Sequence, residues 1–456
     1  MSNRIKALTE TVRGRVITRS DSDYDEARAV YNAMHDRRPR AVIQCVDSAD
    51  VMAAVAAGHD AGLDVAIRGG GHSVPGFGTV EAGLVIDLSK MTSVRVDPIK
   101  KVARVGGGAT WGDVDHATYP FGLAAPGGII STTGVGGLTL GGGIGYLTRS
   151  AGLSIDNLLS ADVVLADGRQ VTASDYQNED LFWALRGGGG NFGVVTSFEF
   201  QLHEVGDIVG GPLFYDFDDA AAVLQCYREF INQAPEQLGC FFGWQIAPPL
   251  PFIPEKRHGE PLCLIVACWT GPLDRGQEAL QPIRKAGPVV AELVTPMPFP
   301  ALNSAFDALL PPGLQHYWKA SFATTLTDGA IAAHVEHGPK VPVVNSTVHI
   351  YPINGACMRV RPEATAFAYR DAQFATVVAG MWPDPADNAK NVGWVKDFYA
   401  ALQPHSTAGS YVNFMAGDDQ DRIRDNYKGN YARLVAIKKQ YDPGNVFHMN
   451  QNIRPA

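Results

Sequence analysis

Three glycine-rich segments constrain this chain more than any other feature of its sequence. The first covers residues 68–76, the second residues 126–145 and the third residues 186–193. Glycine lacks a Cβ atom and adopts positive φ angles freely, so a glycine run lets several backbone N–H groups point at a phosphate. Glycine clusters also make ordinary turns. The segments therefore predict either a ligand-binding loop system or a set of tight turns.

The first segment places three glycines directly before His72 and directly after the short apolar run 63–67. The His72 imidazole is the best nucleophile in this loop. A lone histidine is also often a structural residue. Both interpretations of His72 stay open at this point, and its sequence context must decide between them.

The third segment contains Gly188-x-Gly190-x-x-Gly193, which matches the letters of the dinucleotide-binding fingerprint. That fingerprint needs a strand before it and a helix after it. Here the helix-like residues 180–185 come first and the β-rich residues 194–200 follow. We therefore reject a Rossmann turn. Two interpretations of the third segment remain. It is either a glycine-rich passage into a strand beneath a cofactor or a plain structural turn.

Length and charge limit the class of protein. A chain of 456 residues is long for one hydrophobic core and favours two domains. Apolar residues make up 46% and charged residues 19%, which is typical of a globular, loop-rich enzyme. The net charge of −9 and the lack of a basic run argue against a nucleic-acid partner and a membrane-surface helix.

The N-terminal residues 1–6 contain no apolar signal core, and no stretch reaches the roughly 20 apolar residues that span a bilayer. We therefore expect a cytoplasmic protein. Six cysteines are spread along the chain without a Cys-x-x-Cys pair, so no zinc site and no disulfide framework is predicted. Most of them should be buried thiols.

The N-terminal half predicts a mixed α+β unit. Residues 41–45 indicate a strand, Asp47 or Ser48 can cap a helix, and Gly62 can end it. The strand 63–67 then leads into the first glycine segment. Further strands are expected at 83–88 and 101–105, and a second helix at 110–119.

Beyond about residue 205 glycine becomes rarer and aromatic strands alternate with helices, which predicts a second α+β domain with an antiparallel sheet. Trp244, Trp318 and Tyr351 are candidates for a pocket over a flat cofactor, although aromatic residues also fill ordinary cores. Strands are expected at 213–215, 240–246, 262–269, 289–294, 316–322 and 346–353, and helices at 220–231, 277–286 and 364–377.

The motifs of several other enzyme classes are absent from the sequence. It contains no P-loop, no His-Glu-x-x-His, no Gly-x-Ser-x-Gly and no EF-hand loop. What remains is three glycine segments that can cradle one large, flat, phosphate-bearing ligand. A dinucleotide held by backbone groups fits this pattern best.

The order of four motif groups gives a more specific indication. Residues 68–73, 132–145 and 187–196 are followed by a C-terminal block at 411–414, 429–434, 441–447 and 450–453. With these motifs the chain resembles the berberine-bridge-enzyme-like FAD-linked oxidases of the vanillyl-alcohol-oxidase superfamily, which has a PCMH-type FAD-binding domain. The resemblance covers nearly the whole chain.

The resemblance implies an α+β fold with a two-part FAD-binding domain and an inserted substrate domain on an antiparallel sheet. The FAD-binding domain is expected at 1–205 and 409–456, with the substrate domain at 206–408. Residues 68–73 would hold the pyrophosphate, 132–145 would lie along the isoalloxazine ring and ribityl chain, and 191–195 would approach the adenine. The expected cofactor-binding residues are Arg68, Gly69, Gly70, Gly71, His72, Ser73, Gly76, Thr132, Thr133, Gly134, Gly136, Gly137, Gly141, Gly142, Gly143, Gly145, Asn191, Gly193, Val194, Val195, Asn450, Gln451 and Asn452.

The family's histidine maps onto His72, which would carry FAD through an 8α-histidyl bond. A tightly bound but noncovalent FAD is the alternative. Many relatives attach the flavin a second time through a cysteine, and that position is Ile130 here, so a single attachment is expected. Thr133, beside Gly134, is close to valine in size and favours an oxidase over a dehydrogenase.

Two further positions depart from the family. Its usual catalytic tyrosine is Phe414 here, which cannot accept a proton, and another common tyrosine is Ile144. The active site should thus be more apolar than in sugar-oxidising relatives. The remaining candidates for catalysis are Tyr411, Asn413 and Asn450, although Tyr411 can also be purely structural.

The resemblance implies an FAD-dependent oxidoreductase that takes hydride to flavin N5 and is reoxidised by oxygen with formation of hydrogen peroxide. The expected substrate is a small amine, an alcohol or an aromatic or polyketide-like secondary metabolite. A monomer or homodimer is expected. A non-catalytic flavin-containing binding protein and a flavin-dependent oxygenase are the alternatives.

Overall fold

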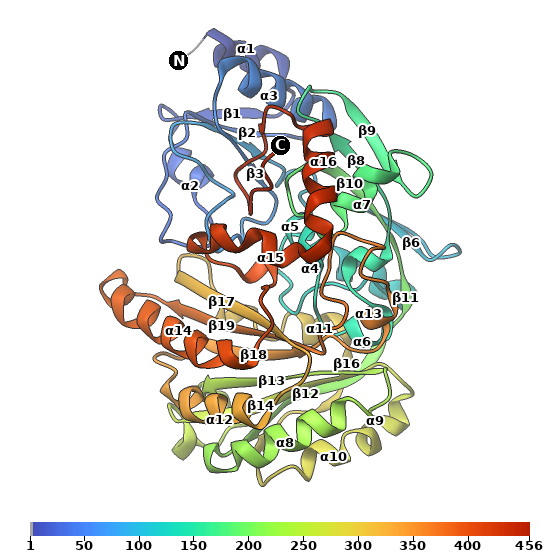
Figure 1. Ribbon diagram of the computed structural model, residues 1–456, viewed down its shortest axis with the longest axis vertical. Helices are drawn as coiled ribbons and strands as arrows, with labels where there is room; N and C mark the ends of the chain where they lie inside the picture. The colour runs from blue at the N-terminus through green and yellow to red at the C-terminus, as the bar shows by residue number, and fades with distance from the viewer. Residues whose placement is uncertain (1–2) are drawn as a thin grey trace.

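Four β-sheets organise the computed structural model, which describes residues 3–456 and leaves Met1 and Ser2 of the N-terminal segment outside (Figure 1). The first sheet has the order β1-β2-β4-β3. Its strands β2, β4 and β3 are parallel, and β1 pairs with β2 in the antiparallel direction. The bounds are β1 Arg15–Thr18, β2 Ala41–Gln44, β3 Val65–Arg68 and β4 Leu84–Asp87.

The helix α3, Ser48–Ala61, connects β2 to β3, as the sequence predicts. The Asp47 carboxylate accepts a hydrogen bond from the Asp50 N–H and so caps the first turn. Gly62 ends the helix in the left-handed region with φ 58°. The crossover places β3 beside β4. The first glycine segment follows directly at the carboxyl end of β3.

The second sheet is antiparallel and has the order β5-β6-β10-β8-β9. The third glycine segment enters β10 from the helix α7, so the helix precedes the glycines and the strand follows them. This order confirms that the segment is not a Rossmann turn. The bounds are β5 Val94–Asp97, β6 Val102–Gly106, β8 Leu158–Val164, β9 Gln170–Ser174, β10 Val194–Gln201, α4 Trp111–Thr118, α5 Val135–Gly141 and α7 Glu179–Leu185. A small third sheet pairs β7, Leu123–Ala124, with β11, His203–Glu204.

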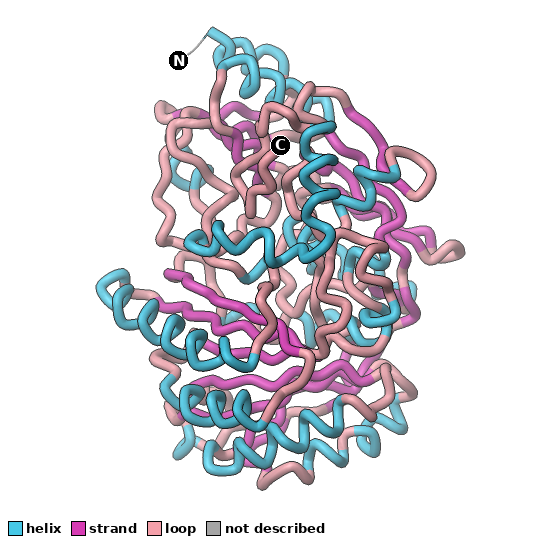
Figure 2. Tube along the Cα trace, viewed as in Figure 1, coloured by secondary structure: helices cyan, strands magenta, loops and turns pink. Residues whose placement is uncertain are grey.

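The fourth sheet is large and antiparallel, with the order β15-β12-β14-β13-β18-β19-β17 and with β16 paired to β12. Helices cover one of its faces, and the other faces the glycine-rich half (Figure 1). Figure 2 shows that mostly loops lie between the two halves. The bounds are β12 Asp207–Tyr215, β13 Leu238–Ile246, β14 Pro261–Trp269, β15 Val289–Glu292, β16 Thr295–Pro298, β17 Gln315–Ala323, β18 Thr347–Pro352, β19 Phe374–Trp382, α8 Ala220–Ile231, α9 Leu273–Ala279, α10 Gln281–Arg284, α11 Phe299–Asn303, α12 Asp328–His337 and α14 Asn388–Leu402.

Two helix predictions in this half need correction. Residues 364–377 do not form a helix: turns precede β19, which pairs with β17 and β18. The strand conformation is favoured over the helix because Thr376, Val377 and Val378 are β-branched and the whole strand is buried. The predicted helix 277–286 is divided at Leu280 into α9 and α10, where Pro282 lies in the first turn of the second helix.

The structure decides between the two interpretations of Trp244. Its side chain packs with Phe242 and Phe217 in the core between the sheet and its helices. Alternate residues of a strand point to opposite faces, so Trp244 lies on the face that the glycine-rich half does not touch. It is an ordinary core residue.

The chain then returns to the glycine-rich half through α15, Ile423–Tyr427, and α16, Tyr431–Tyr441, drawn in red in Figure 1. The helix α16 packs on α7, where the Tyr441 hydroxyl donates to Asp180. Within residues 3–456, every helix is too short or too polar to cross a lipid bilayer.

Candidate functional site

A cavity of about 350 Å³ lies between the glycine segments and the inner face of the large sheet. Its two ends differ in construction. The end beside β3 is lined largely by glycine backbone, and we call it the flavin half because the motifs there carry the expected FAD residues. The end beside β17, β18 and β19 is lined by side chains, and we call it the substrate half.

The flavin half depends on the close approach of two glycine segments. A Cβ atom on Gly70 would lie 2.4 Å from the Gly134 nitrogen, and one on Gly134 would lie 2.4 Å from the Gly70 nitrogen. Any side chain at either position would therefore push the first and second segments apart. Gly137 and Gly190 differ, because a Cβ there would meet no atom within 4 Å.

Arg68 fixes the base of the first segment. Its guanidinium lies 3.0 Å from the buried Asp87 carboxylate and donates a second bond to the Ala29 carbonyl at 3.0 Å. The Ser89 N–H and hydroxyl also donate to Asp87. The Arg68 charge is thus neutralised within the protein, and this residue holds the base of the loop.

His72 lies at the wall of the cavity with its ring stacked on Tyr31, at a centroid distance of 3.9 Å and an angle of 13°. Burial lowers the pKa of His72 to about 4, and a hydrogen bond to the Thr132 backbone opposes this shift. The imidazole is neutral at physiological pH. A neutral imidazole has a free nitrogen lone pair, which is what a nucleophile requires.

The third glycine segment is supported by the returning chain. The Asn191 side chain is buried, donates to the Gly188 and Gln451 carbonyls, and accepts from the Ile453 N–H. Lys438 lies behind it with a fully buried ammonium group, 2.6 Å from the Asp442 carboxylate. The ammonium also donates to the Asn191 and Phe447 carbonyls.

The substrate half is mostly apolar. Leu310, Met381 and Phe414 line it together with the Trp318 ring. Its polar centre is a pair on β18, where His349 Nδ1 and the Tyr351 hydroxyl are 2.7 Å apart. Burial lowers the pKa of His349 to about 3 and raises that of Tyr351, so both groups are neutral at physiological pH.

Tyr411 and Asn413 lie at the border between the two halves. The buried Tyr411 hydroxyl accepts a hydrogen bond from the Gly143 N–H at 2.7 Å and one from the Asn413 amide at 2.9 Å. Burial raises the pKa of Tyr411 to about 12, so it keeps its proton at neutral pH. Phe414, Ile130 and Ile144 line the same cavity with apolar side chains.

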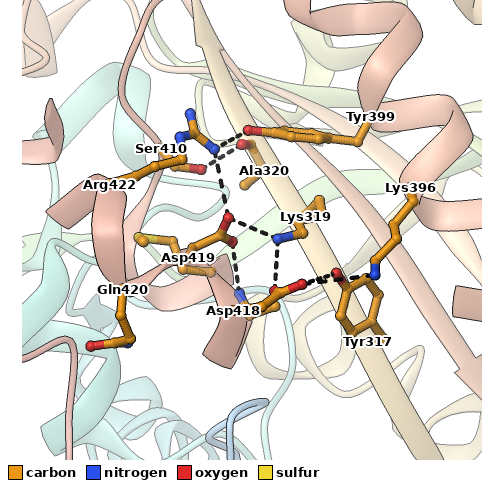
Figure 3. Close-up of polar contacts among 12 residues, drawn as sticks. Tyr317, Lys319, Ala320, Lys396, Tyr399, Ser410, Asp418, Asp419, Gln420 and Arg422 are labelled. Atoms are coloured by element: carbon orange, nitrogen blue, oxygen red, sulfur yellow. Dashed lines mark hydrogen bonds and ion pairs between the residues drawn. The ribbon is translucent and has the colours of Figure 1, made fainter.

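A polar cluster on β17 attaches the start of the returning chain to the large sheet (Figure 3). The Lys319 ammonium donates to Asp418 at 2.8 Å and to Asp419 at 2.7 Å. The Tyr317 hydroxyl also donates to Asp418. The neighbouring Gln420 amide reaches Gln451, so this cluster fixes a segment that contacts the cavity wall.

The unpaired polar atoms at the cavity are consistent with a bound ligand. Within residues 3–456, the buried atoms Asn450 Oδ1, Gln451 Nε2 and Trp318 Nε1 have no hydrogen-bond partner. Buried polar groups are normally paired, so such atoms need an explanation. Together with the open space at Gly137 and Gly190, they fit a large flat cofactor with polar edges.

Comparison with known proteins agrees with this geometry. Residues 39–174 match the FAD binding domain model, and residues 410–454 match the model described as berberine and berberine like. An uncharacterized FAD-linked oxidoreductase of Bacillus subtilis, YgaK, is 35% identical, with 97% of each chain covered. The chain belongs to the berberine-bridge-enzyme-like FAD-linked oxidoreductases.

Two solved structures show how far the likeness extends. The structure of 6-hydroxy-D-nicotine oxidase from Arthrobacter nicotinovorans has a TM-score of 0.87 and 26% identity, with both chains fully covered. Glucooligosaccharide oxidase from Acremonium strictum has the same TM-score, identity and coverage, and it carries a 6-S-cysteinyl, 8α-N1-histidyl FAD. These neighbours confirm the predicted α+β fold of the vanillyl-alcohol-oxidase type.

The structure brings many of the expected site residues of this oxidoreductase to one cavity and places others behind its wall. Those behind the wall act through packing or hydrogen bonds, as Gly143 does beneath Ser154. The lining set is Arg68, Gly69, Gly70, Gly71, His72, Ser73, Thr133, Gly134, Gly136, Gly137, Gly193, Val195, Tyr411, Asn413, Asn450 and Gln451. The set outside the lining is Gly76, Thr132, Gly141, Gly142, Gly143, Gly145, Asn191, Val194 and Asn452.

Sequence reasoning missed several lining residues of this oxidoreductase. Tyr31, His349 and Met381 carry no motif and come from parts of the chain far from the glycine segments. Strand alternation gives one usable signal, because His349 and Tyr351 are two residues apart on β18 and share a face. Tyr31 offers no such signal, since it lies in a loop.

Proposed function

We propose that the protein is an FAD-dependent oxidase that holds its flavin by one covalent bond, from His72 to the 8α carbon. The single observation that carries this proposal is the position of the His72 imidazole at the wall of a glycine-lined cavity. Burial lowers its pKa to about 4, which favours the neutral, nucleophilic form. The covalent histidyl flavin of the Acremonium enzyme supports it. Ile130 lines the cavity without a nucleophilic atom, which supports a single attachment.

The chain's own groups would bind the cofactor as follows. Backbone of residues 68–73 would hold the pyrophosphate, residues 132–145 would lie along the ring and ribityl chain, and residues 191–195 would lie toward the adenine. Asn450 and Gln451 would use their unpaired atoms on the cofactor's polar edges. When bound, FAD would accept hydride at N5 and pass the electrons to oxygen, giving hydrogen peroxide.

The cavity favours an uncharged substrate. Of the described residues that line it, Arg68 alone carries a charge, and its guanidinium is paired with Asp87. A charged substrate would lose its hydration without gaining an ionic partner. We therefore infer a small neutral amine, an alcohol or an aromatic secondary metabolite. Hydrogen bonds from Tyr351 and from Trp318 Nε1 would orient its polar group.

Three residues have proposed roles at the reacting centre. Tyr411 is held by Gly143 and Asn413 and stays protonated, so it acts as a hydrogen-bonding group and not as a base. Asn413 fixes Tyr411 and donates to the Leu138 carbonyl. Asn450 has a free amide oxygen for the ligand. Phe414 removes the usual base from this wall, which suits a substrate that loses hydride in its neutral form.

The location and assembly of the protein are also proposals. We propose a cytoplasmic monomer or homodimer. All six cysteines are free, and five of them are buried. Unpaired thiols are the rule in a reducing compartment. Cell fractionation and light scattering of the purified protein would test these two statements.

The mass of the denatured protein tests the attachment directly. We expect a gain of one FAD on the wild-type chain and no gain on His72→Ala. A flavin that acid precipitation releases from the wild-type protein would contradict the covalent bond and leave the FAD site in place. Purified protein without a yellow absorbance band would contradict both.

Anaerobic mixing with substrates tests the oxidase activity. We expect at least one neutral amine or alcohol in a panel to bleach the flavin, and oxygen to restore the colour with one equivalent of peroxide. A panel of amines, alcohols and sugars that never bleaches it would favour a non-catalytic flavin-containing binding protein.

A further inference from the structure

Tyr31 makes the closest ring contact of His72. The two rings are stacked at 3.9 Å with an angle of 13° between their planes. On the substrate-domain side, the Tyr31 ring contacts His316 at 4.8 Å. Tyr31 therefore separates two histidines, one from the first glycine segment and one from β17. Neither the glycine motifs nor the expected site residues include Tyr31.

Backbone and side-chain bonds hold Tyr31 from both halves of the molecule. Its hydroxyl donates to the Leu310 carbonyl at 2.6 Å, and its N–H donates to the Gly71 carbonyl at 3.1 Å. The next residue, Asn32, donates to the Val74 and His316 carbonyls. The backbone bond of Tyr31, the bonds of Asn32 and the ring contact with His316 are enough to fix the plane of the Tyr31 ring without its hydroxyl, and that plane sets the orientation of the imidazole stacked on it.

The Thr132 backbone also acts on the His72 imidazole and opposes the lowering of its pKa. Stacking on Tyr31 controls the plane of the ring. A neutral imidazole keeps a lone pair on one nitrogen, and that lone pair lies in the ring plane. The ring plane therefore limits the directions in which this nitrogen can form a bond.

We propose that Tyr31 is a positioning residue for flavin attachment, which holds the His72 ring in the plane from which its nitrogen reaches the 8α carbon. This inference rests on the proposed histidyl attachment. Reaction rates depend strongly on such alignment, because a misplacement of 1 Å costs about 100-fold.

The step that Tyr31 assists would balance as follows. A bond would form between the His72 nitrogen and the 8α carbon, while one C–H bond of that carbon breaks with loss of a proton and the imidazole gives up its N–H proton. The two electrons would stay on the flavin ring, and molecular oxygen would then accept them together with two protons to give hydrogen peroxide. Tyr31 gains and loses no proton in this step.

The experiment compares the full-length chain with Tyr31→Leu and Tyr31→Phe. For each purified protein, the denatured mass gives the covalent fraction, and acid precipitation gives the noncovalent flavin. We expect Tyr31→Leu to carry at least tenfold less covalent FAD and to release noncovalent FAD instead. Tyr31→Phe keeps the ring and loses the hydroxyl, so it should match the wild type.

Tyr24→Leu is the matched control. Tyr24 is also buried and also donates to a backbone carbonyl, that of Pro39, but it packs on Ile17 and Val42 away from the cavity. Its covalent fraction should equal that of the wild type. If Tyr31→Leu binds no flavin because it misfolds, Tyr31→Met provides the same comparison with a flexible side chain of similar volume.

Two outcomes would overturn the inference. Full covalent loading of Tyr31→Leu would show that the ring is not needed. Equal losses in Tyr31→Phe and Tyr31→Leu would assign the effect to the bond with Leu310. A wild-type chain without any adduct is a different result, because it removes the proposed attachment and this inference with it.

Discussion

The two halves of the cavity present different chemistry to a ligand. The flavin half shows backbone, where Gly70 and Gly134 pack too closely for any side chain. The substrate half shows side chains, with Tyr351 and His349 among apolar neighbours. A backbone wall suits a phosphate-bearing cofactor, because N–H groups can face a phosphate without side chains between them. A side-chain wall can change with each substitution, so substrate choice can diverge while the cofactor site stays the same.

The largest expected effect comes from the support behind the flavin half. Lys438→Met would leave the buried Asp442 carboxylate without its cation and should destabilise the fold by about 3–5 kcal/mol. Bound flavin should fall with it, because Lys438 also holds the Asn191 carbonyl. Urea denaturation and flavin absorbance would measure both effects. The neighbouring exposed Lys439→Met is the control, and equal losses in the two variants would contradict the prediction.

A pair of alanine substitutions tests the backbone wall itself. Gly134→Ala would place a Cβ 2.4 Å from the Gly70 nitrogen and should cost about 1–3 kcal/mol of stability. Gly137→Ala meets no protein atom within 4 Å and should keep stability while it lowers flavin content, because its methyl group enters the cavity. Thermal unfolding and the ratio of flavin to protein absorbance separate the two. A stable, flavin-loaded Gly134→Ala would show that the segments can move apart freely.

A substitution in the side-chain wall of the substrate half should change turnover and leave flavin binding intact. Tyr351→Phe is expected to keep the full flavin content. It should lower kcat/KM by about tenfold, because the loss of one hydrogen bond to the substrate costs about 1.4 kcal/mol of transition-state stabilisation. Tyr215→Phe is the control, since its hydroxyl bonds the Ile283 carbonyl on the helix-covered face of the same sheet. Steady-state peroxide release would measure turnover. Loss of flavin from Tyr351→Phe would remove the distinction between the two halves.

The dependence of stability on pH also compares the two halves. One neutral histidine lies in each half, with burial lowering the pKa of His72 to about 4 and of His349 to about 3. Below pH 6.5 the unfolded chain therefore binds more protons than the folded one, and stability falls with decreasing pH by up to about 1.4 kcal/mol per unit for each histidine. His349→Gln should reduce the change of unfolding free energy with pH between pH 6.5 and 4. The reduction corresponds to one proton fewer taken up on unfolding. An unchanged slope in His349→Gln would contradict the assignment.

Local signals predicted much of the flavin half. Asp47 and Gly62 mark the ends of α3, and the helix before Gly188 with the strand after Gly193 excludes a Rossmann turn. These features depend on residues within a few positions of one another. The motif order along the chain then indicated the family.

The substrate half depends on contacts that local patterns do not encode. Residues 364–377 have a mixed pattern that favours a helix in isolation, and pairing with β17 and β18 makes the end of this stretch a strand. Trp244 and Tyr351 are both aromatic strand residues, and only the register of the sheet places one in the core and the other in the cavity. Tyr31 reaches His72 because a loop docks against residues 310–316.

The bond between the Ile453 N–H and the Asn191 side chain joins residues that are 262 positions apart in the chain. At a synthesis rate of about 5–20 residues per second, roughly 13–50 s separate the appearance of the third glycine segment from that of its support. A chain still on the ribosome therefore has its glycine loops but not the wall that holds them. This support of the third glycine segment can therefore form only after the last residues of the chain have been made.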